Sequence, residues 1–290
     1  MIIIAIVVLY KPEGVKFIEN LKSLSLQVDE ICVVDNSSDS NKKLLREVPH
    51  LIYFPQYKNI GIAAAQNIGL RYAIKKGYDY VLFSDPDSSI PTDAVENLFT
   101  THKKLSENGY DVGAVGSTAY SEATGLPYHI KDSFVLDIPE LNVTEVTYTM
   151  NSISLIHTDL FKMVGFMDES LFIDGVDDEW CWRAANLLRK RFFIDRNVII
   201  RHNLGKSKGK IGKRNISIAS PRRLYYEYRN YIWLRRRDYV PRQWTKYNGW
   251  KYVVKLFYYP LFVTPRLENL KNILKGVKDG LFVRSDSPEY

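Results

Sequence analysis

The sequence has few cysteines and no long apolar run. Its 290 residues include only Cys32 and Cys181, which form no CxxC pair. This scarcity argues against a disulfide scaffold or a zinc knuckle, and favours the reducing cytosol as the compartment. No segment reaches the roughly 20 apolar residues that a membrane-spanning helix needs. The nearest, residues 253–263, contains Lys255 and Pro260, which fits a segment lying in a membrane interface rather than crossing it.

Several nucleotide and nucleophile motifs are also absent. The chain has no GxGxxG loop, no GxxxxGK[ST] loop and no GxSxG turn, which disfavours a dinucleotide-binding site, a P-loop and an acyl-transfer elbow. The apolar opening, residues 2–9, has no basic residues before it and no small-residue cleavage site after it, and Pro12 soon follows. It is typical of a buried parallel strand rather than of a signal peptide.

What the sequence does have is ordinary bulk composition and an uneven charge. Hydrophobic residues make up 46% and charged residues 25%, as in globular chains, so disorder is excluded as the main state. Of the 40 Lys and Arg residues, 26 lie in 181–290 against only 7 acidic residues, a net charge of +19 there and −12 in residues 1–180. The rear therefore suits an anionic partner: nucleic acid, a membrane surface or phosphate.

Hydrophobic periodicity predicts an α/β fold with a mostly parallel sheet. In the front part we expect strands at 2–9, 30–35, 51–54 and 80–84, and helices at 14–26, 62–76 and 91–107. Further on we expect strands at 112–115, 143–156 and 192–201, a short helix or turn at 161–167 and a helix at 179–190. A flexible basic loop follows His202, and aromatic and basic residues with helical spacing begin at Pro221.

Polar residues follow three of the predicted strands. These are Tyr10, then Asp35 and Asn36, then Asp85 and Asp87 in a D-x-D sequence. Because ligands of open parallel sheets bind at the carboxyl ends of strands, we expect these side chains to share one edge. Two carboxylates one residue apart suit a hard divalent cation with bound phosphates, although a solvated turn that caps the next helix explains them equally well.

A second acidic cluster precedes an apolar helical segment. Asp177, Asp178 and Glu179 could hold a general base, or could be acidic residues in a first helical turn, where they favour the helix dipole. His202 stands where a predicted strand ends, as a structural histidine or as a metal ligand. The loop after His202 could bind phosphate oxygens through its cations, or it is a solvated basic loop. The cations are Lys206, Lys208, Lys210, Lys213 and Arg214.

In their order along the chain, these elements resemble family 2 glycosyltransferases of the GT-A fold, and more narrowly their bacterial rhamnosyltransferase branch. The resemblance covers roughly residues 3–230. It rests on VVLYKP, VVDNSS, NIGIAAAQNIGL, FSDPDSS, GVDDEWCWRA, RHNLG and SPRRLYYEYRN. It implies a mixed, mostly parallel sheet with flanking helices and a C-terminal helical segment. It also implies a catalytic domain at 1–220, with a nucleotide-sugar part at roughly 1–110 and an acceptor part at roughly 111–220, and a basic, aromatic-rich helical region at 221–290.

The resemblance implies roles for individual residues. Asp35 would bind the pyrimidine base of the nucleotide sugar, and Asp85 would bind its ribose. The rest of the donor pocket would be Leu9, Tyr10, Asn67, Lys206 and Arg214. Asp87 and His202 would hold Mg²⁺ or Mn²⁺. In the family's E-D-x-E-[FW] pattern Asp177 is the general base, with Glu179 beside it. Val176 replaces the leading acid here, which makes Asp178 the second choice.

The implied reaction is an inverting, metal-dependent transfer of L-rhamnose from dTDP-β-L-rhamnose to a glycan or lipid-linked acceptor in bacterial surface polysaccharide synthesis. The alternatives are the same mechanism with a UDP-sugar such as UDP-galactofuranose and, remotely, a nucleic-acid-binding protein that uses the basic rear. The aromatic and basic residues after Arg222 suit an anionic membrane surface, or packing against the catalytic domain. We expect a cytoplasmic protein on the inner face of the membrane that binds no nucleic acid.

Overall fold

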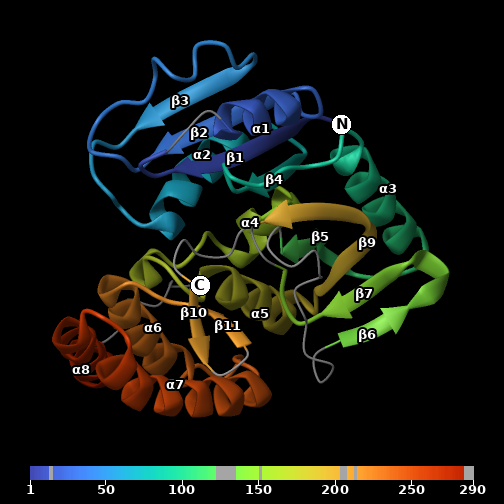
Figure 1. The fold of residues 1–290 in the computed structure, drawn as a ribbon. Helices are drawn as coiled ribbons and strands as arrows, with labels where there is room; N and C mark the ends of the chain where they lie inside the picture. The colour runs from blue at the N-terminus through green and yellow to red at the C-terminus, as the bar shows by residue number, and fades with distance from the viewer. Residues whose placement is uncertain (13–15, 122–134, 150–151, 203–207, 212–213, 284–290) are drawn as a thin grey trace.

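The computed structural model describes residues 1–12, 16–121, 135–149, 152–202, 208–211 and 214–283. Its centre is a nine-stranded sheet with strand order β3-β2-β1-β4-β8-β5-β9-β7-β6, covered by helices (Figure 1). The expected mixed α/β sheet with flanking helices and a helical C-terminal segment is confirmed.

The amino-terminal strands form the parallel part of the sheet. They are β1 (Ile3–Leu9), β2 (Glu30–Asp35), β3 (Leu51–Pro55) and β4 (Tyr80–Ser84). β1 is buried along almost its whole length, because helices cover both faces of a parallel sheet and leave no strand face for water. Since the four strands run the same way, their carboxyl ends meet at one edge, as the sequence predicts.

The rest of the sheet runs in both directions. It contains β5 (Val112–Ser121), β6 (Val135–Ile138), β7 (Val143–Val146), β8 (Ser154–His157) and β9 (Arg191–His202). The single strand expected at 143–156 is wrong: β7 pairs with β6 and β9, whereas β8 lies between β4 and β5. Ile153 has φ 59°, a left-handed conformation that no continuous strand accommodates.

Helices follow the strands. They are α1 (Lys16–Ser25), α2 (Ile62–Lys76), α3 (Ala94–Glu107), α4 (Asp159–Val164) and α5 (Val176–Leu188), with 3₁₀ turns η2 (Pro139–Leu141) and η3 (Glu169–Leu171). α5 begins three residues before the expected start, after Gly175 with φ 82°. Its acidic residues therefore occupy the first helical turn, where carboxylates are favoured by the helix dipole.

Part of the expected flexible loop after His202 is ordered. β10 (Lys208–Ile211) and β11 (Arg214–Ser217) form an antiparallel pair, so the expectation of a loop throughout is wrong. Backbone pairing between the strands outweighs the turn-like composition that predicted a loop.

Three helices end the chain, α6 (Pro221–Leu234), α7 (Arg242–Phe262) and α8 (Arg266–Phe282), and gather at one end of the molecule (Figure 1). α6 and α8 approach closely at Gly280, which has no side chain: a Cβ atom there would lie only 2.9 Å from the Cβ of Ile232 in α6. Trp233 and Leu234 of α6 belong to the same buried cluster as Ile6 of β1 and Trp180 of α5. Among the described residues, no helix is long and apolar enough to span a membrane.

Candidate active site

Asp35 organises the loop at the carboxyl end of β2. Its carboxylate is buried and accepts hydrogen bonds from the Tyr53 hydroxyl at 2.5 Å, the Asn41 side-chain amide at 2.9 Å and the Ser37 backbone N–H at 2.9 Å. Burial raises the pKa of Asp35, but these hydrogen bonds outweigh it and leave the pKa below its ordinary value. Asp35 is therefore a fixed anion at this edge, and its contact with a base stays a prediction.

The first and fourth strands bring their ends to the same edge. Leu9 is buried and Tyr10, next to it, is 47% exposed. After β4, Asp85 is half-buried and Asp87 is exposed in a turn. The turn is tied to the middle of the chain, because the buried hydroxyl of Ser88 lies 2.7 Å from that of Ser152. The geometry thus brings Tyr10, Asp35, Asp85 and Asp87 to one edge, as expected.

Asn67 has its hydrogen bonds inside the protein. Its Nδ2 donates to the Met167 carbonyl at 2.9 Å and to the Glu169 carboxylate at 2.8 Å, while its Oδ1 accepts from the Met167 N–H at 2.9 Å. It fastens α2 to the segment that leads to α5. Its expected place in a donor pocket stays a prediction.

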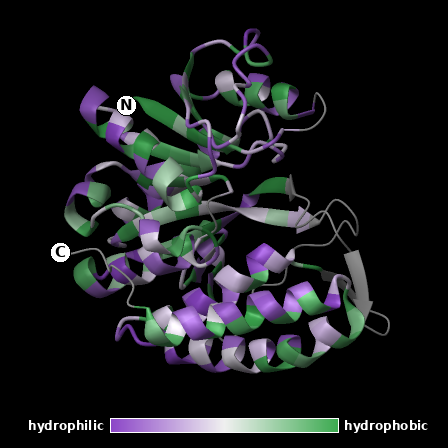
Figure 2. Cartoon of the chain, turned by 90° about the vertical axis from the view of Figure 1, so that its left-hand side faces the viewer, coloured by the Kyte–Doolittle hydropathy of each residue, from purple (hydrophilic) through white to green (hydrophobic). Residues whose placement is uncertain are grey.

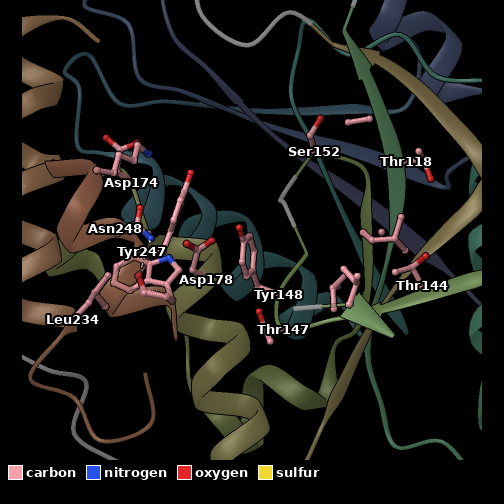
Figure 3. Close-up of a pocket in the computed structure, with 18 of the residues that line it drawn as sticks. Thr118, Thr144, Thr147, Tyr148, Ser152, Asp174, Asp178, Leu234, Tyr247 and Asn248 are labelled. Carbon is pink, nitrogen blue, oxygen red and sulfur yellow. Dashed lines mark hydrogen bonds between the residues drawn. The ribbon is translucent and has the colours of Figure 1, made fainter. Parts of the chain in front are cut away.

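A cavity of about 880 Å³ lies between the second half of the sheet and the C-terminal helices. Asp178 lines it, with Asp174, Tyr148 and Ser152, and Figure 3 shows Asp178 between Tyr148 and Tyr247. The other wall comes from α6 and α7; among its residues are Arg223, Asn230, Trp244, Tyr247, Asn248, Lys251 and Tyr252. Aromatic rings with a few convergent polar groups are typical of a small-molecule site.

Of the two candidate bases, Asp178 lines the cavity and Asp177 is not among its lining residues. The pKa of Asp178 is raised to about 7, because the effect of burial outweighs a hydrogen bond from Trp244 that lowers the pKa. The carboxylate of Asp178 in turn raises the pKa of the Tyr148 hydroxyl, and Asp177 adds a smaller effect of the same sign. Both carboxylates therefore act on the same wall of the cavity.

Glu179 points into the protein. It is fully buried, and its Oε1 lies 2.8 Å from Arg183 Nε, 3.1 Å from Arg237 Nη1 and 2.6 Å from the Tyr239 hydroxyl. Arg237 also pairs with the buried Asp168 at 2.5 Å. This buried ion cluster, Asp168–Arg237–Glu179–Arg183, ties α5 to the turn after α6. Sequence reasoning missed it, because its members lie up to 69 residues apart.

Sequence reasoning also missed the hydrogen bonds by which α6 holds the loop before α5. The side-chain amide of Asn230 donates to the carbonyls of Leu171, Ile173 and Asp174 at 2.9, 2.6 and 2.9 Å. Arg229 Nη2 donates to the Ser170 carbonyl at 2.6 Å. The only signal in the sequence was the motif SPRRLYYEYRN, whose last two residues are this Arg-Asn pair. Hydrogen bonds from helix α6 thus hold the segment at residues 170–174 in place, directly before the acidic first turn of α5.

Three expected site residues cannot be placed. Lys206 lies outside the described residues, and His202 and Arg214 belong to strands whose side chains are not described there. Among the described residues no group of three or more His, Cys, Asp or Glu side chains could hold a metal ion alone. Asp85 and Asp87 still supply carboxylate oxygens in one turn, and Mg²⁺ commonly takes one or two protein carboxylates with substrate phosphates. The donor set therefore fits an ion that binds together with a diphosphate.

Comparisons with known proteins agree with this geometry. The chain is 33% identical over 251 residues to the dTDP-rhamnosyl transferase RfbF of Shigella flexneri, which is 82% of this chain and 81% of the relative. It is 28% identical over 193 residues to the low-salt glycan biosynthesis hexosyltransferase Agl10 of Haloferax volcanii, 62% of this chain and 60% of the relative.

Solved structures share the fold. Staphylococcus aureus TarS in complex with UDP-GlcNAc has a TM-score of 0.55 at 16% identity, covering 98% of this chain and 93% of that one. GalNAc-T7 with UDP, GalNAc and Mn²⁺ has a TM-score of 0.56 at 14% identity, covering 97% of this chain and 56% of that one. The expected GT-A fold is thereby confirmed. With residues 6–170 matching glycosyl transferase family 2 and acidic residues at the sheet edge and the adjoining cavity, the chain belongs to that family of glycosyltransferases.

Proposed function

We propose that this enzyme transfers L-rhamnose from dTDP-β-L-rhamnose to a hydroxyl of a glycan or lipid-linked oligosaccharide. The observation that carries the proposal is the 33% identity, over 82% of the chain, to a dTDP-rhamnosyl transferase. The cavity supports it, because its aromatic and polar lining is chemically suited to a sugar acceptor.

The reaction is a single displacement. The acceptor oxygen attacks the anomeric carbon of the donor, the bond from that carbon to the dTDP oxygen breaks, and the acceptor proton passes to a carboxylate of the first turn of α5. One displacement inverts the configuration, so a β-linked donor gives an α-L-rhamnosyl product. We assign the proton to Asp177, which has the base position of the family pattern. Asp178, which lines the cavity, binds and orients the acceptor.

The donor is held at the sheet edge. We assign Asp35 to the pyrimidine and Asp85 to the ribose, beside Leu9 and Tyr10, and Lys206 and Arg214 to the diphosphate. Asp87 and His202 would hold a Mg²⁺ or Mn²⁺ ion, which would stabilise the charge on the leaving group. Asn67 and Glu179 act as positioning residues, since their polar atoms bind protein groups.

The acceptor and the place of action follow from the chemistry of the C-terminal helices. Their aromatic and basic side chains suit an anionic membrane surface, where a lipid-linked acceptor would be anchored. We place the enzyme at the cytoplasmic face of the cell membrane, with no nucleic-acid partner.

A panel of nucleotide sugars tests the donor. dTDP-rhamnose, UDP-galactofuranose and UDP-hexoses are each incubated with Mn²⁺ or EDTA, and hydrolysis and transfer are followed by mass spectrometry. Metal-dependent turnover of dTDP-rhamnose, lost in Asp177→Asn, supports the proposal. Preferential turnover of a UDP-sugar overturns the donor assignment. If Asp178→Asn abolishes transfer while Asp177→Asn only raises the KM for the acceptor, the roles of the two carboxylates are reversed.

A further inference from the structure

Helix α7 carries a row of exposed apolar side chains on its outer side. The row, here named the outer stripe, consists of Trp250, Val253, Val254, Phe257 and Leu261. Its spacing of three, four and seven residues places these side chains on one face of a helix. Trp250 is 69% exposed, Phe257 63% and Leu261 57%. Most side chains of this size are buried, so five exposed ones on one helix face make the stripe a candidate contact surface.

Helix α8 adds apolar side chains at the same end of the molecule. Leu267, Leu274 and Leu281 recur every seven residues and are all exposed. α7 and α8 pack against each other. Figures 1 and 2 place the two helices at the end of the molecule remote from strands β1–β3. The two helices thus present several large exposed apolar residues at one end of the molecule, and exposed apolar residues gathered in this way are typical of an interaction site.

The charges around this surface indicate its partner. Residues 242–262 contain four basic residues and no acidic one. Around the stripe, and on α8, the exposed cations are Arg242, Lys246, Lys251, Arg266, Lys271, Lys275 and Lys278. A second copy of the chain would bring these cations face to face, which is repulsive. Anionic lipid instead offers phosphates to the cations and an acyl boundary to Trp250 and Phe257.

We propose that the outer stripe and the three α8 leucines dock on the surface of an anionic lipid bilayer. A neighbouring face of α7 lines the cavity through Trp244, Asn248 and Lys251. Docking by the stripe therefore holds the cavity beside the bilayer. The docking deepens the membrane location given in the proposed function and rests on it, whereas it does not depend on which sugar is transferred.

Vesicle flotation tests the docking surface. The full chain is mixed with phosphatidylglycerol–phosphatidylcholine vesicles or with phosphatidylcholine alone, at low and at high NaCl. We expect flotation with the anionic vesicles at low salt, reduced by salt because surface charges are screened. The double variant Trp250→Glu, Phe257→Glu should lower the bound fraction about tenfold or more, since each side chain loses its apolar burial.

Matched measurements distinguish the other outcomes. Leu26→Glu makes the same kind of change at a site that is 84% exposed near the end of α1, and should float like the wild type. Equal flotation of the double variant and the wild type overturns the proposal. So does light scattering that shows a dimer which these two substitutions dissociate, because the stripe then binds a second copy.

Tryptophan emission gives a second readout. Of the five tryptophans, Trp250 is the exposed one, whereas Trp180, Trp182 and Trp233 are buried and Trp244 is half-buried. A blue shift with anionic vesicles that Trp250→Phe removes supports insertion of the stripe. Failure of sugar transfer leaves these binding results intact. The double variant should also transfer sugar normally to an acceptor that has no lipid.

Discussion

Helices α6 and α7 follow each other in the chain and share a composition rich in aromatic and basic residues, yet they are built in opposite ways. α6 buries polar groups: Arg229 and Asn230 lie inside and bind the loop before α5. α7 fully buries only Asn248 and Tyr259; Trp244 and Leu256 are partly buried, whereas Trp250, Phe257 and Leu261 are exposed. Composition alone therefore assigns the two helices the same role, and their contacts assign them different ones.

The two helices therefore make different contacts. α6 supports the candidate site, because Arg229 and Asn230 bind the loop that precedes the acidic turn of α5. α7 lines the cavity with one face and offers an apolar surface with another. Substitutions on α6 should therefore damage stability and catalysis, whereas substitutions on the outer stripe should leave both unchanged in solution.

The largest effect is expected at the turn that α6 positions. Asp177→Asn removes the proposed base and should lower transfer by about 10²–10⁴-fold. Calorimetry should show nearly unchanged binding of dTDP, because the amide is isosteric with the carboxylate and Asp177 is not assigned to the nucleotide. Normal turnover in this variant would remove Asp177 from the mechanism.

The next effect concerns the buried ion cluster. Arg237→Met leaves Asp168 and Glu179 buried without their shared cation, and should lower the free energy of unfolding by about 3–5 kcal/mol. Urea denaturation measures the change. The control is Arg71→Met: its pair with Glu169 has side chains 56% and 49% exposed, so we expect a loss below about 1 kcal/mol. Equal losses would show that the cluster adds nothing beyond a surface ion pair.

Asn230→Ala tests the fastening of the loop. It removes three hydrogen bonds to backbone carbonyls and should cost about 2–3 kcal/mol of unfolding free energy, together with a lower kcat. Asn272→Ala removes one local bond, to the Glu268 carbonyl within α8, and serves as the matched control. If Asn230→Ala keeps its full kcat, α6 does not position the acidic turn.

Asp178→Asn should alter the pH dependence of stability. The pKa of Asp178 is raised from 3.8 to about 7 in the folded protein, so between these values the folded chain keeps a proton that the unfolded chain has lost. Its contribution to stability is full at low pH and falls as the pH rises through about 7. The melting temperature of the variant should match the wild type near pH 4 and exceed it at pH 8, where the buried wild-type carboxylate is charged. A difference in melting temperature that does not change with pH would contradict the raised pKa of Asp178.

The smallest effect is expected on the outer stripe. Leu261→Gln removes an apolar group that is 57% exposed and should change the unfolding free energy by less than about 0.5 kcal/mol in the absence of lipid. Thermal denaturation checks it. A loss of 2 kcal/mol or more, about the value for a buried leucine, would mean that the stripe is covered in solution.

Much of the fold could be predicted because its signals are local. The apolar runs at Ile3–Leu9 and Tyr80–Ser84, each followed by polar residues, indicate buried parallel strands that end at a ligand-binding edge. The strand at 143–156 was wrong because apolar content cannot reveal the break at Ile153, whose left-handed backbone is hydrogen-bonded to Phe83 of β4 and Ser117 of β5. The expected start of α5 was three residues late, although acidic residues are favoured in a first helical turn.

Short motifs predicted the candidate carboxylates, whose roles stay predictions, whereas the residues that hold the surrounding segments in place were not predicted. Asp35, Asp85 and Asp177 lie in short motifs at strand or helix ends. Asn230 and Arg237 bind residues more than 50 positions away in the chain. Asn230 ends the motif SPRRLYYEYRN, but nothing in the local sequence shows which segment either side chain binds.

By itself, the sequence determined the α/β order, the acidic edge and the basic, aromatic C-terminal region, because periodicity and composition are properties of consecutive residues. Only the tertiary structure decided that Glu179 is buried among arginines, that Asp178 lines the cavity, and that α6 faces inward while α7 exposes Trp250 and Phe257. Burial and pairing depend on which distant segments pack together, and that is fixed only when the whole chain folds.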